Sequence, residues 1–276
     1  MLKRMARRNV LLFAAAAAFA AAEAVGAQPA FDWAPYDHLL HTYVNERGYV
    51  DYPGLKLNRG ELDAVIAQLD HASPDSDPAL FPTRIAKLAY WINAYNAFVL
   101  RGVVDYYPIA SVKDVYLFNG FFSRIEFKAG GTELSLRELE NEILRKRFGD
   151  PRIHFAIVCA SEGCPRLARE AYLPERLDEQ FDARTSLFFN EDRNVRIDAA
   201  GNRLFLSKIM DWYSDDFIAT LPADQKEITS YVERWLTPER QAALARLRAP
   251  KIVYVDYDWR INDQARPDVA TPHVTR

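Results

Sequence analysis

The hydrophobic residues of this chain recur mostly at the spacing of amphipathic helices. In several stretches, apolar side chains repeat every three or four positions, which places them on one face of a helix. The helices predicted in this way cover residues 36–49, 59–69, 83–104, 134–148, 177–190, 227–236 and 238–248. Lys87 is the only charged residue between positions 85 and 100, so we expect the third of these helices to be central and buried on most sides.

Patterns typical of strands are fewer and shorter. The predicted extended segments are 48–52, 120–127, 153–158 and 252–259, together with a hairpin formed by 195–197 and 204–206. The run at 153–158 is apolar almost throughout, as in a strand buried on both faces. Because helices bracket only a few scattered strands, we predict an α+β fold, a single mostly helical domain around a small mixed or antiparallel sheet.

The first 27 residues differ from the rest and predict a signal peptide. Four basic residues precede an apolar, alanine-rich run from Val10 to Ala22, and Val25 and Ala27 have the small side chains expected before a cleavage site. The apolar run is too short to span a bilayer, which takes about 20 residues. We therefore expect cleavage after Ala27, a periplasmic or secreted protein without a stable membrane span, and one globular domain at residues 28–276.

The net charge of the chain argues against one class of partner, nucleic acid. The chain has 35 Lys and Arg against 38 Asp and Glu, a formal net charge of −3, and loss of the basic signal peptide makes this balance more negative. Binding to nucleic acid requires a clustered positive excess that neutralises phosphates. We therefore expect no nucleic-acid partner and predict instead an unidentified small molecule, peptide or envelope component.

Five motifs occur in a fixed order along the chain. They are Tyr-Trp-Ile-Asn-Ala-Tyr-Asn-Ala at 90–97, Leu-x-x-Leu-Glu at 136–140, Ile-His-Phe-Ala-Ile-Val-Cys-Ala-Ser-Glu-Gly-Cys-Pro at 153–165, Tyr172 with Leu-Asp at 177–178, and Ser-Lys-Ile with Asp-Trp-Tyr and Asp-Phe at 207–217. Together they resemble the domain-of-unknown-function 547 family over about residues 35–220. The family usually has a histidine after the acidic residue that corresponds to Glu140, whereas this chain has Asn141. The resemblance implies no particular activity, because none is assigned to the family.

His154 and Cys159 suggest thiol chemistry, because nowhere else in the sequence do a histidine and a cysteine come so close. A cysteine nucleophile needs a neighbouring base or positive charge to lower its pKa from about 8.5, and imidazole is a common choice. Their offset places the two side chains on opposite faces of an ideal strand, so they can pair only if the strand ends near Val158. Asn93 could then orient the imidazole, as in a Cys-His-Asn site.

The same cysteine has two structural interpretations. It can be a small buried residue beside a hydrogen-bonded core histidine. Alternatively, Cys159 and Cys164, the only two cysteines, can form a disulfide in the oxidising compartment predicted above. Closing so short a loop would contribute about 2 kcal/mol and would remove the free thiol. Two sulfurs and His154 make an incomplete zinc site, so we expect no metal and no cofactor.

Other polar and aromatic residues are candidates for ligand binding. Asn93 and Asn96 lie three positions apart on one face of the central helix, where they either serve a site or tie the helix to loop carbonyls. The remaining candidates are Ser161, Glu140, Trp91 and the aromatic loop at residues 116–122.

Two functional classes remain open. In the first, the protein is a hydrolase or acyltransferase that acts on a peptide or amide bond, with Cys159 as nucleophile, His154 as base and Asn93 as the orienting residue. In the second, it is a non-catalytic envelope domain that binds a ligand or a protein in a groove, and a Cys159–Cys164 disulfide is structural. The state of the Cys159 thiol discriminates between them.

Overall fold

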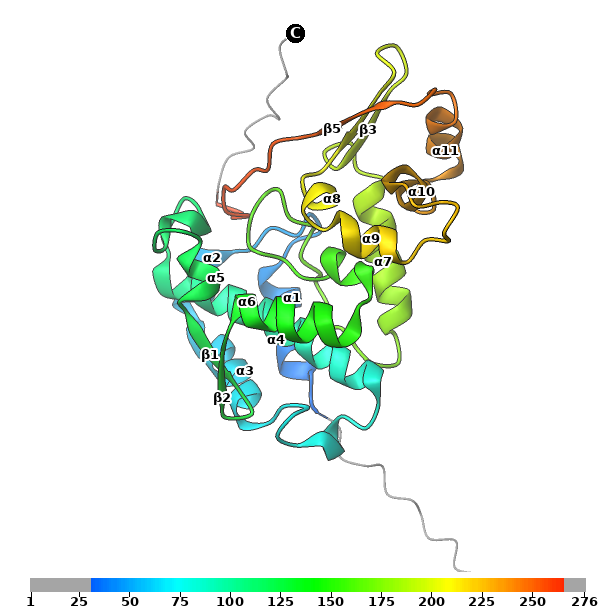
Figure 1. Ribbon diagram of the computed structural model, residues 1–276. Coiled ribbons are helices and arrows are strands. Elements are labelled where there is room, and N and C mark those ends of the chain that lie inside the picture. Colours follow the sequence, from blue (N-terminus) through cyan, green and yellow to red (C-terminus); the bar gives the residue numbers. More distant parts are fainter. Residues whose placement is uncertain (1–30, 266–276) are drawn as a thin grey trace, which may run out of the picture.

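A computed structural model describes residues 31–265, which form a helical body with two small sheets (Figure 1). The predicted α+β fold class is confirmed, because helices predominate and the two sheets have two and three strands. The predicted signal peptide at residues 1–27 lies outside the described residues. Within the described part, no helix is both long and apolar enough to cross a membrane.

The first half of the fold is built around the helix α4 (Arg84–Tyr106). The elements before it are α1 (Ala34–Tyr43), α2 (Tyr52–Leu57), α3 (Arg59–His71) and the short 3-10 helix η1 (Pro78–Leu80). Thr83 caps α4, because its side chain accepts a hydrogen bond from the backbone N–H of Ala86. From Leu88 to Leu100 every side chain of α4 is buried, which confirms that this helix is central.

A hairpin and a π-helix follow α4. The elements here are η2 (Val112–Asp114), α5 (Gly120–Ser123), β1 (Glu126–Ala129), β2 (Thr132–Ser135), α6 (Leu136–Glu138) and η3 (Leu139–Phe148). Ser135 and Glu138 form a capping box that starts α6. The chain then continues into η3, a π-helix, in which hydrogen bonds span five residues instead of four. This π-helix packs against α4 and ends at Gly149, whose φ of 63° lies in the left-handed region that glycine adopts at low cost.

The strand predicted at residues 153–158 is wrong. Asp150 caps a 3-10 helix, η4 (Pro151–Phe155), because its side chain accepts a hydrogen bond from Arg152 N, and Pro151 occupies the first turn. Residues 157–159 have no regular structure. A buried strand and a buried helical turn share the same apolar run, so the hydrophobic pattern could not separate them. The strand predicted at 120–127 is also mostly wrong, since its first four residues form α5.

The second half of the fold combines short helices with a mixed three-stranded sheet. Its elements are α7 (Leu177–Phe189), β3 (Val195–Asp198), β4 (Arg203–Leu206), α8 (Ile209–Trp212), α9 (Ser214–Ala219), α10 (Ile228–Glu233), α11 (Pro238–Leu244) and β5 (Lys251–Tyr254). β3 and β4 form the predicted hairpin, in which Val195 lies opposite Leu206. β5 pairs with β4 in parallel, with Arg203 opposite Lys251, which completes the sheet in the order β3-β4-β5.

After β5 the chain returns to the first half of the fold, as the red segment in Figure 1 shows. Isolated β-bridges pair Ile261 with Ser161 and Asp263 with Val50. Segment 255–263, which we call the C-terminal strap, therefore ties the mixed sheet to the helices around α4.

Two clusters of buried hydrophobic side chains form the core of the described chain. The larger surrounds α4, and the smaller lies among α7, α9 and the strands of the mixed sheet. Tyr257 of the C-terminal strap packs against both clusters. The candidate site lies where they meet.

Candidate functional site

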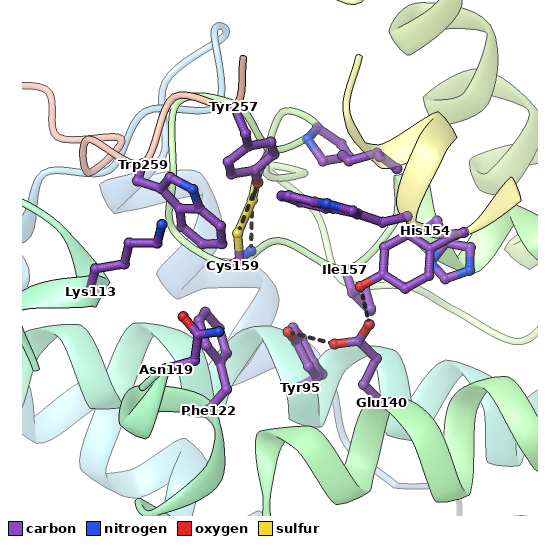
Figure 2. Close-up of a pocket in the computed structure, with 15 residues that line it drawn as sticks. Tyr95, Lys113, Asn119, Phe122, Glu140, His154, Ile157, Cys159, Tyr257 and Trp259 are labelled. Atoms are coloured by element: carbon purple, nitrogen blue, oxygen red, sulfur yellow. Dashed lines mark hydrogen bonds between the residues drawn. A yellow bond between two sulfur atoms is a disulfide. The ribbon is translucent and has the colours of Figure 1, made fainter. Parts of the chain in front are cut away.

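A pocket of about 460 Å³ opens beside α4, η3 and the C-terminal strap (Figure 2). This volume is in the range of small-molecule sites, about 300–1,000 Å³. Its aromatic lining residues are Tyr95, Phe122, Trp212, Tyr213, Tyr257 and Trp259. Its charged and polar lining residues include Lys113, Asn119, Glu140 and His154.

One wall of the pocket is an aromatic cluster of Trp212, Tyr257 and Trp259. The ring centroid of Tyr257 lies 4.9 Å from that of Trp212 and 4.6 Å from that of Trp259. Trp212 belongs to α8 and is 45% exposed, and the other two belong to the C-terminal strap. Such rings present large, rigid apolar surfaces. This wall therefore suits the apolar body of a ligand.

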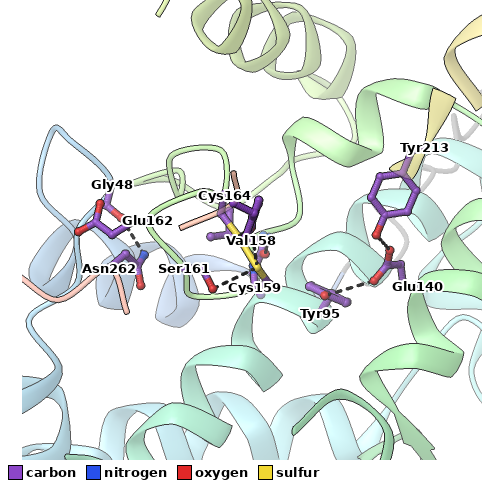
Figure 3. Close-up of a disulfide and its surroundings, with 12 residues drawn as sticks. Gly48, Tyr95, Glu140, Val158, Cys159, Ser161, Glu162, Cys164, Tyr213 and Asn262 are labelled. Atoms are coloured by element: carbon purple, nitrogen blue, oxygen red, sulfur yellow. Dashed lines mark hydrogen bonds between the residues drawn. A yellow bond between two sulfur atoms is a disulfide. The ribbon is translucent and has the colours of Figure 1, made fainter. Parts of the chain in front are cut away.

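The carboxylate of Glu140 is held by two tyrosine hydroxyls. Tyr213 donates to Oε1 at 2.5 Å, and Tyr95 donates to Oε2 at 3.5 Å, as the dashed lines in Figure 3 show. Burial, reinforced by the adjacent Glu140, raises the pKa of both phenols, so both remain protonated donors. Glu140 lies in the first turn of η3, where the π-helical winding sets its direction. The sequence named Glu140 as a binding candidate, and the structure places it in the pocket.

His154 lies in the pocket wall and is fixed by other residues. Its Nε2 donates to Oδ2 of Asp216 at 2.8 Å, and its ring stacks on Tyr213 with 3.9 Å between centroids. Arg145 donates to the same carboxylate through Nε and Nη2, at 2.7 and 3.0 Å. The hydrogen bond from His154, together with Arg145, lowers the pKa of Asp216 well below its usual range. Asn141 joins this network, because its Oδ1 accepts a hydrogen bond from Arg145 at 2.7 Å.

Cys159 and Cys164 form a disulfide at the edge of the pocket (Figure 3). Their Cα atoms are 6.3 Å apart, within the usual range for disulfides, and no free cysteine occurs in residues 31–265. The Tyr257 hydroxyl lies 3.1 Å from Cys159 Sγ and 2.9 Å from Cys164 Sγ. The disulfide therefore contacts the aromatic cluster through the hydroxyl of Tyr257. Ser161, a predicted binding residue, is buried with its Oγ 3.6 Å from Cys159 Sγ.

The asparagines of α4 hold loops and do not reach His154. Asn93 donates to the carbonyl of Tyr172 and accepts from its N–H, both at 2.9 Å. Asn96 donates to the carbonyl of Ala156 at 3.0 Å and accepts from the N–H of Val158 at 2.9 Å. Of the two roles considered for these amides, the structure shows the one that ties the helix to loops.

The Cys159, His154 and Asn93 triad is consequently not assembled. Cys159 is bonded to Cys164, the side-chain partner of His154 is Asp216 and not Asn93, and both amide atoms of Asn93 bind a loop. Trp91, another candidate, is buried against Tyr90 with 4.9 Å between ring centroids and does not line the pocket.

The aromatic loop at residues 116–122 divides between the pocket and the surface. Asn119 and Phe122 line the pocket. Leu117 and Phe118 are 73% and 87% exposed. Asn119 has a φ of 58°, in the left-handed region that asparagine tolerates better than most residues.

Several pocket residues were not found by sequence reasoning. Lys113, Tyr257 and Trp259 line the site, yet they lie far from the motifs at 136–140 and 153–165. The available signal was the density of aromatic residues at the end of the strand predicted at 252–259. Within residues 31–265, no three acidic, histidine or cysteine side chains converge as a metal-binding group.

Comparison with known proteins gives a family match over part of the chain. Residues 81–189 match the family described as "Protein of unknown function, DUF547". The match confirms the resemblance over residues 81–189, a range that includes Glu140, His154 and both cysteines but not the motif at 207–217. Neither the curated proteins nor the solved structures that were compared gave a match.

Proposed function

We propose a function from the pocket itself, because the family that residues 81–189 match has no assigned activity: the protein binds a small organic ligand there, through the aromatic cluster and Glu140. The observation that carries this proposal is the Glu140 carboxylate, which faces the pocket with its oxygens held by Tyr213 and Tyr95.

The held carboxylate supports binding for an electrostatic reason. Tyr213 and Tyr95 are neutral donors, so they orient Glu140 without neutralising its charge. Arg145 attracts Glu140 electrostatically, but its hydrogen bonds go to Asp216 and Asn141. An oriented acceptor whose geometry is fixed in advance loses little entropy when a donor group of a ligand arrives. The neighbouring aromatic rings supply apolar contact for the rest of the ligand.

The disulfide favours binding over thiol catalysis. A hydrolase or acyltransferase that uses Cys159 would first need reduction of the Cys159–Cys164 bond, because the sulfur of a disulfide is not a nucleophile. Non-reducing alkylation of the unfolded protein tests this directly: we expect no labelled thiol, and labelling of both Cys159 and Cys164 would restore the catalytic hypothesis. The pairing also supports our proposal that the protein is periplasmic or secreted, where disulfides persist.

A direct test of the binding proposal is saturation-transfer NMR with a library that contains amines, carboxylic acids, zwitterions, sugars and neutral aromatic compounds. We expect at least one class to bind, and Glu140→Gln or Trp212→Ala to weaken binding by about tenfold or more. Phe118→Ala is a matched control, because Phe118 is an exposed aromatic residue that does not line the pocket. Failure of every class to bind, or binding that survives both pocket substitutions, would refute the proposal.

A further inference from the structure

The pocket contains two opposite charges, Lys113 and Glu140, that form no ion pair with another side chain of residues 31–265. The Nζ atom of Lys113 instead lies 4.2 Å from the ring centroid of Trp259. Glu140 is hydrogen-bonded to the neutral phenols of Tyr213 and Tyr95. Both charged groups line the same pocket.

The two charges occupy different ends of the pocket. In Figure 2, Lys113 lies beside Trp259 and Asn119 at one side, and Glu140 lies at the other, with Cys159 and Ile157 between them. They come from separate elements, since Lys113 belongs to η2 and Glu140 to η3. A single group of a ligand therefore does not meet both, and a ligand that spans the pocket meets one at each end.

Asn119 strengthens the positive end. No hydrogen bond involves its side-chain amide in the described part of the chain, although this residue lines the pocket. The amide N–H₂ and the Lys113 ammonium are both donors on the same side. Two donors, one of them charged, match the two oxygens of a carboxylate. The negative end offers only acceptor atoms to a ligand, because the Glu140 carboxylate has no proton to donate when ionised.

From this arrangement we propose that the ligand is a zwitterion of the amino-acid or short-peptide class, whose ammonium group binds Glu140 and whose carboxylate binds Lys113 and Asn119. This inference rests on the proposed function and specifies its ligand. The aromatic cluster of Trp212, Tyr257 and Trp259 takes the apolar side chain between the two ends. Opposite charges at fixed positions also select against ligands that carry one charge, because one protein charge would then be buried without a partner.

Three peptides of nearly equal size test which group of the ligand binds at each end of the pocket. The probes are glycyl-phenylalanine with both ends free, its C-terminal amide and its N-acetyl form, each titrated by calorimetry at low ionic strength. We expect the free peptide to bind at least tenfold more tightly than either blocked form. Glu140→Gln should abolish the preference over the N-acetyl form and keep the preference over the amide. Lys113→Gln should have the opposite effect.

The outcomes separate this inference from the proposed function. If the three peptides bind with equal affinity, or if each substitution weakens all three alike, the pocket binds ligands but the assignment of its ends is wrong. If none of the peptides binds while another class in the NMR library does, the ligand class is wrong and the binding function stands. If nothing in either set binds, both fail. Unchanged melting temperatures of the two variants exclude loss of the fold as the cause.

Discussion

At the scale of single residues, two carboxylates near the pocket are held in opposite ways. Asp216 is bound by the imidazole of His154 and the guanidinium of Arg145. Glu140 is bound by neutral tyrosine hydroxyls. The carboxylate of Asp216 is therefore paired within the protein, whereas the carboxylate of Glu140 is available to a ligand. This contrast is the reason we assign a structural role to one and a binding role to the other.

The pairing of Asp216 predicts a pH dependence of stability. Folding lowers the pKa of this carboxyl below the value of about 3.9 that it has in an unfolded chain. Asp216 therefore stabilises the folded state above pH 4, and this contribution is lost as the pH falls below that value. Asp216→Asn should reduce the free energy of unfolding at pH 7 by about 2 kcal/mol, since it removes a charged hydrogen-bond acceptor.

Urea unfolding at a series of pH values checks this prediction. The difference between the wild type and Asp216→Asn should shrink steadily between pH 4 and pH 2. Asp215→Asn is the control, because Asp215 is an exposed neighbour, and it should leave the curve nearly unchanged. A difference that stays constant over this range would show that the charge of Asp216 is not the source of its contribution.

At the scale of elements, α4 acts as a scaffold for the loop that carries the disulfide. Asn96 is buried and satisfies one carbonyl and one N–H on either side of Ile157, a residue of the pocket wall. Because this loop has no regular structure, it lacks the backbone partners that a sheet would supply. The side chain of Asn96 takes their place.

Asn96→Ala should therefore be strongly destabilising. It leaves the buried carbonyl of Ala156 and the buried N–H of Val158 without partners, which we expect to cost about 3 kcal/mol. Equilibrium unfolding in urea measures this loss. Asn58→Ala is a suitable comparison, because the amide of Asn58 makes an exposed bond to a carbonyl of its own helix region and should cost less than about 1 kcal/mol. Equal effects of the two changes would contradict the scaffold role.

At the scale of the whole molecule, the C-terminal strap completes the pocket. It supplies Tyr257 and Trp259, and it is anchored beyond them by Asn262. The Asn262 side chain accepts a hydrogen bond from the Tyr52 hydroxyl at 2.9 Å and donates to the carbonyl of Gly48 at 3.1 Å. The pocket therefore depends on contacts between the two ends of the described chain.

Asn262→Ala should loosen the strap and weaken ligand binding at a distance. Asn262 does not line the pocket, so a several-fold loss of affinity would arise from mobility of Tyr257 and Trp259. Hydrogen exchange of residues 255–263 should accelerate in this variant and remain unchanged in Lys251→Ala, an exposed change in β5. Unchanged exchange in Asn262→Ala would show that the anchor lies elsewhere along the strap.

The sequence by itself determined the features that depend on near neighbours in the chain. The period of apolar residues predicts α4, and Ser135 with Glu138 predicts a helix start. The Asp-Ala-Ala-Gly-Asn turn at 198–202, between the runs 195–197 and 204–206, predicts the β3–β4 hairpin. Each of these signals is complete within a few residues, because helix periodicity and capping are local interactions. The order of the five motifs is likewise a property of the sequence alone, and the resemblance drawn from it is confirmed over residues 81–189.

Tertiary structure alone decided which polar groups meet. His154 is five positions from Cys159, yet its hydrogen-bond partner is Asp216, on a helix much later in the chain. Tyr257 reaches the disulfide from the C-terminal strap, and the two phenols that hold Glu140 come from α4 and from the turn after α8. Spacing along the chain cannot reveal such partners, because they are fixed by how distant segments pack around α4. The sequence thus named Glu140, His154 and both cysteines as candidates, and it offered the Cys159–Cys164 pairing as one alternative. Only the packing of those segments determined the partners of Glu140 and His154.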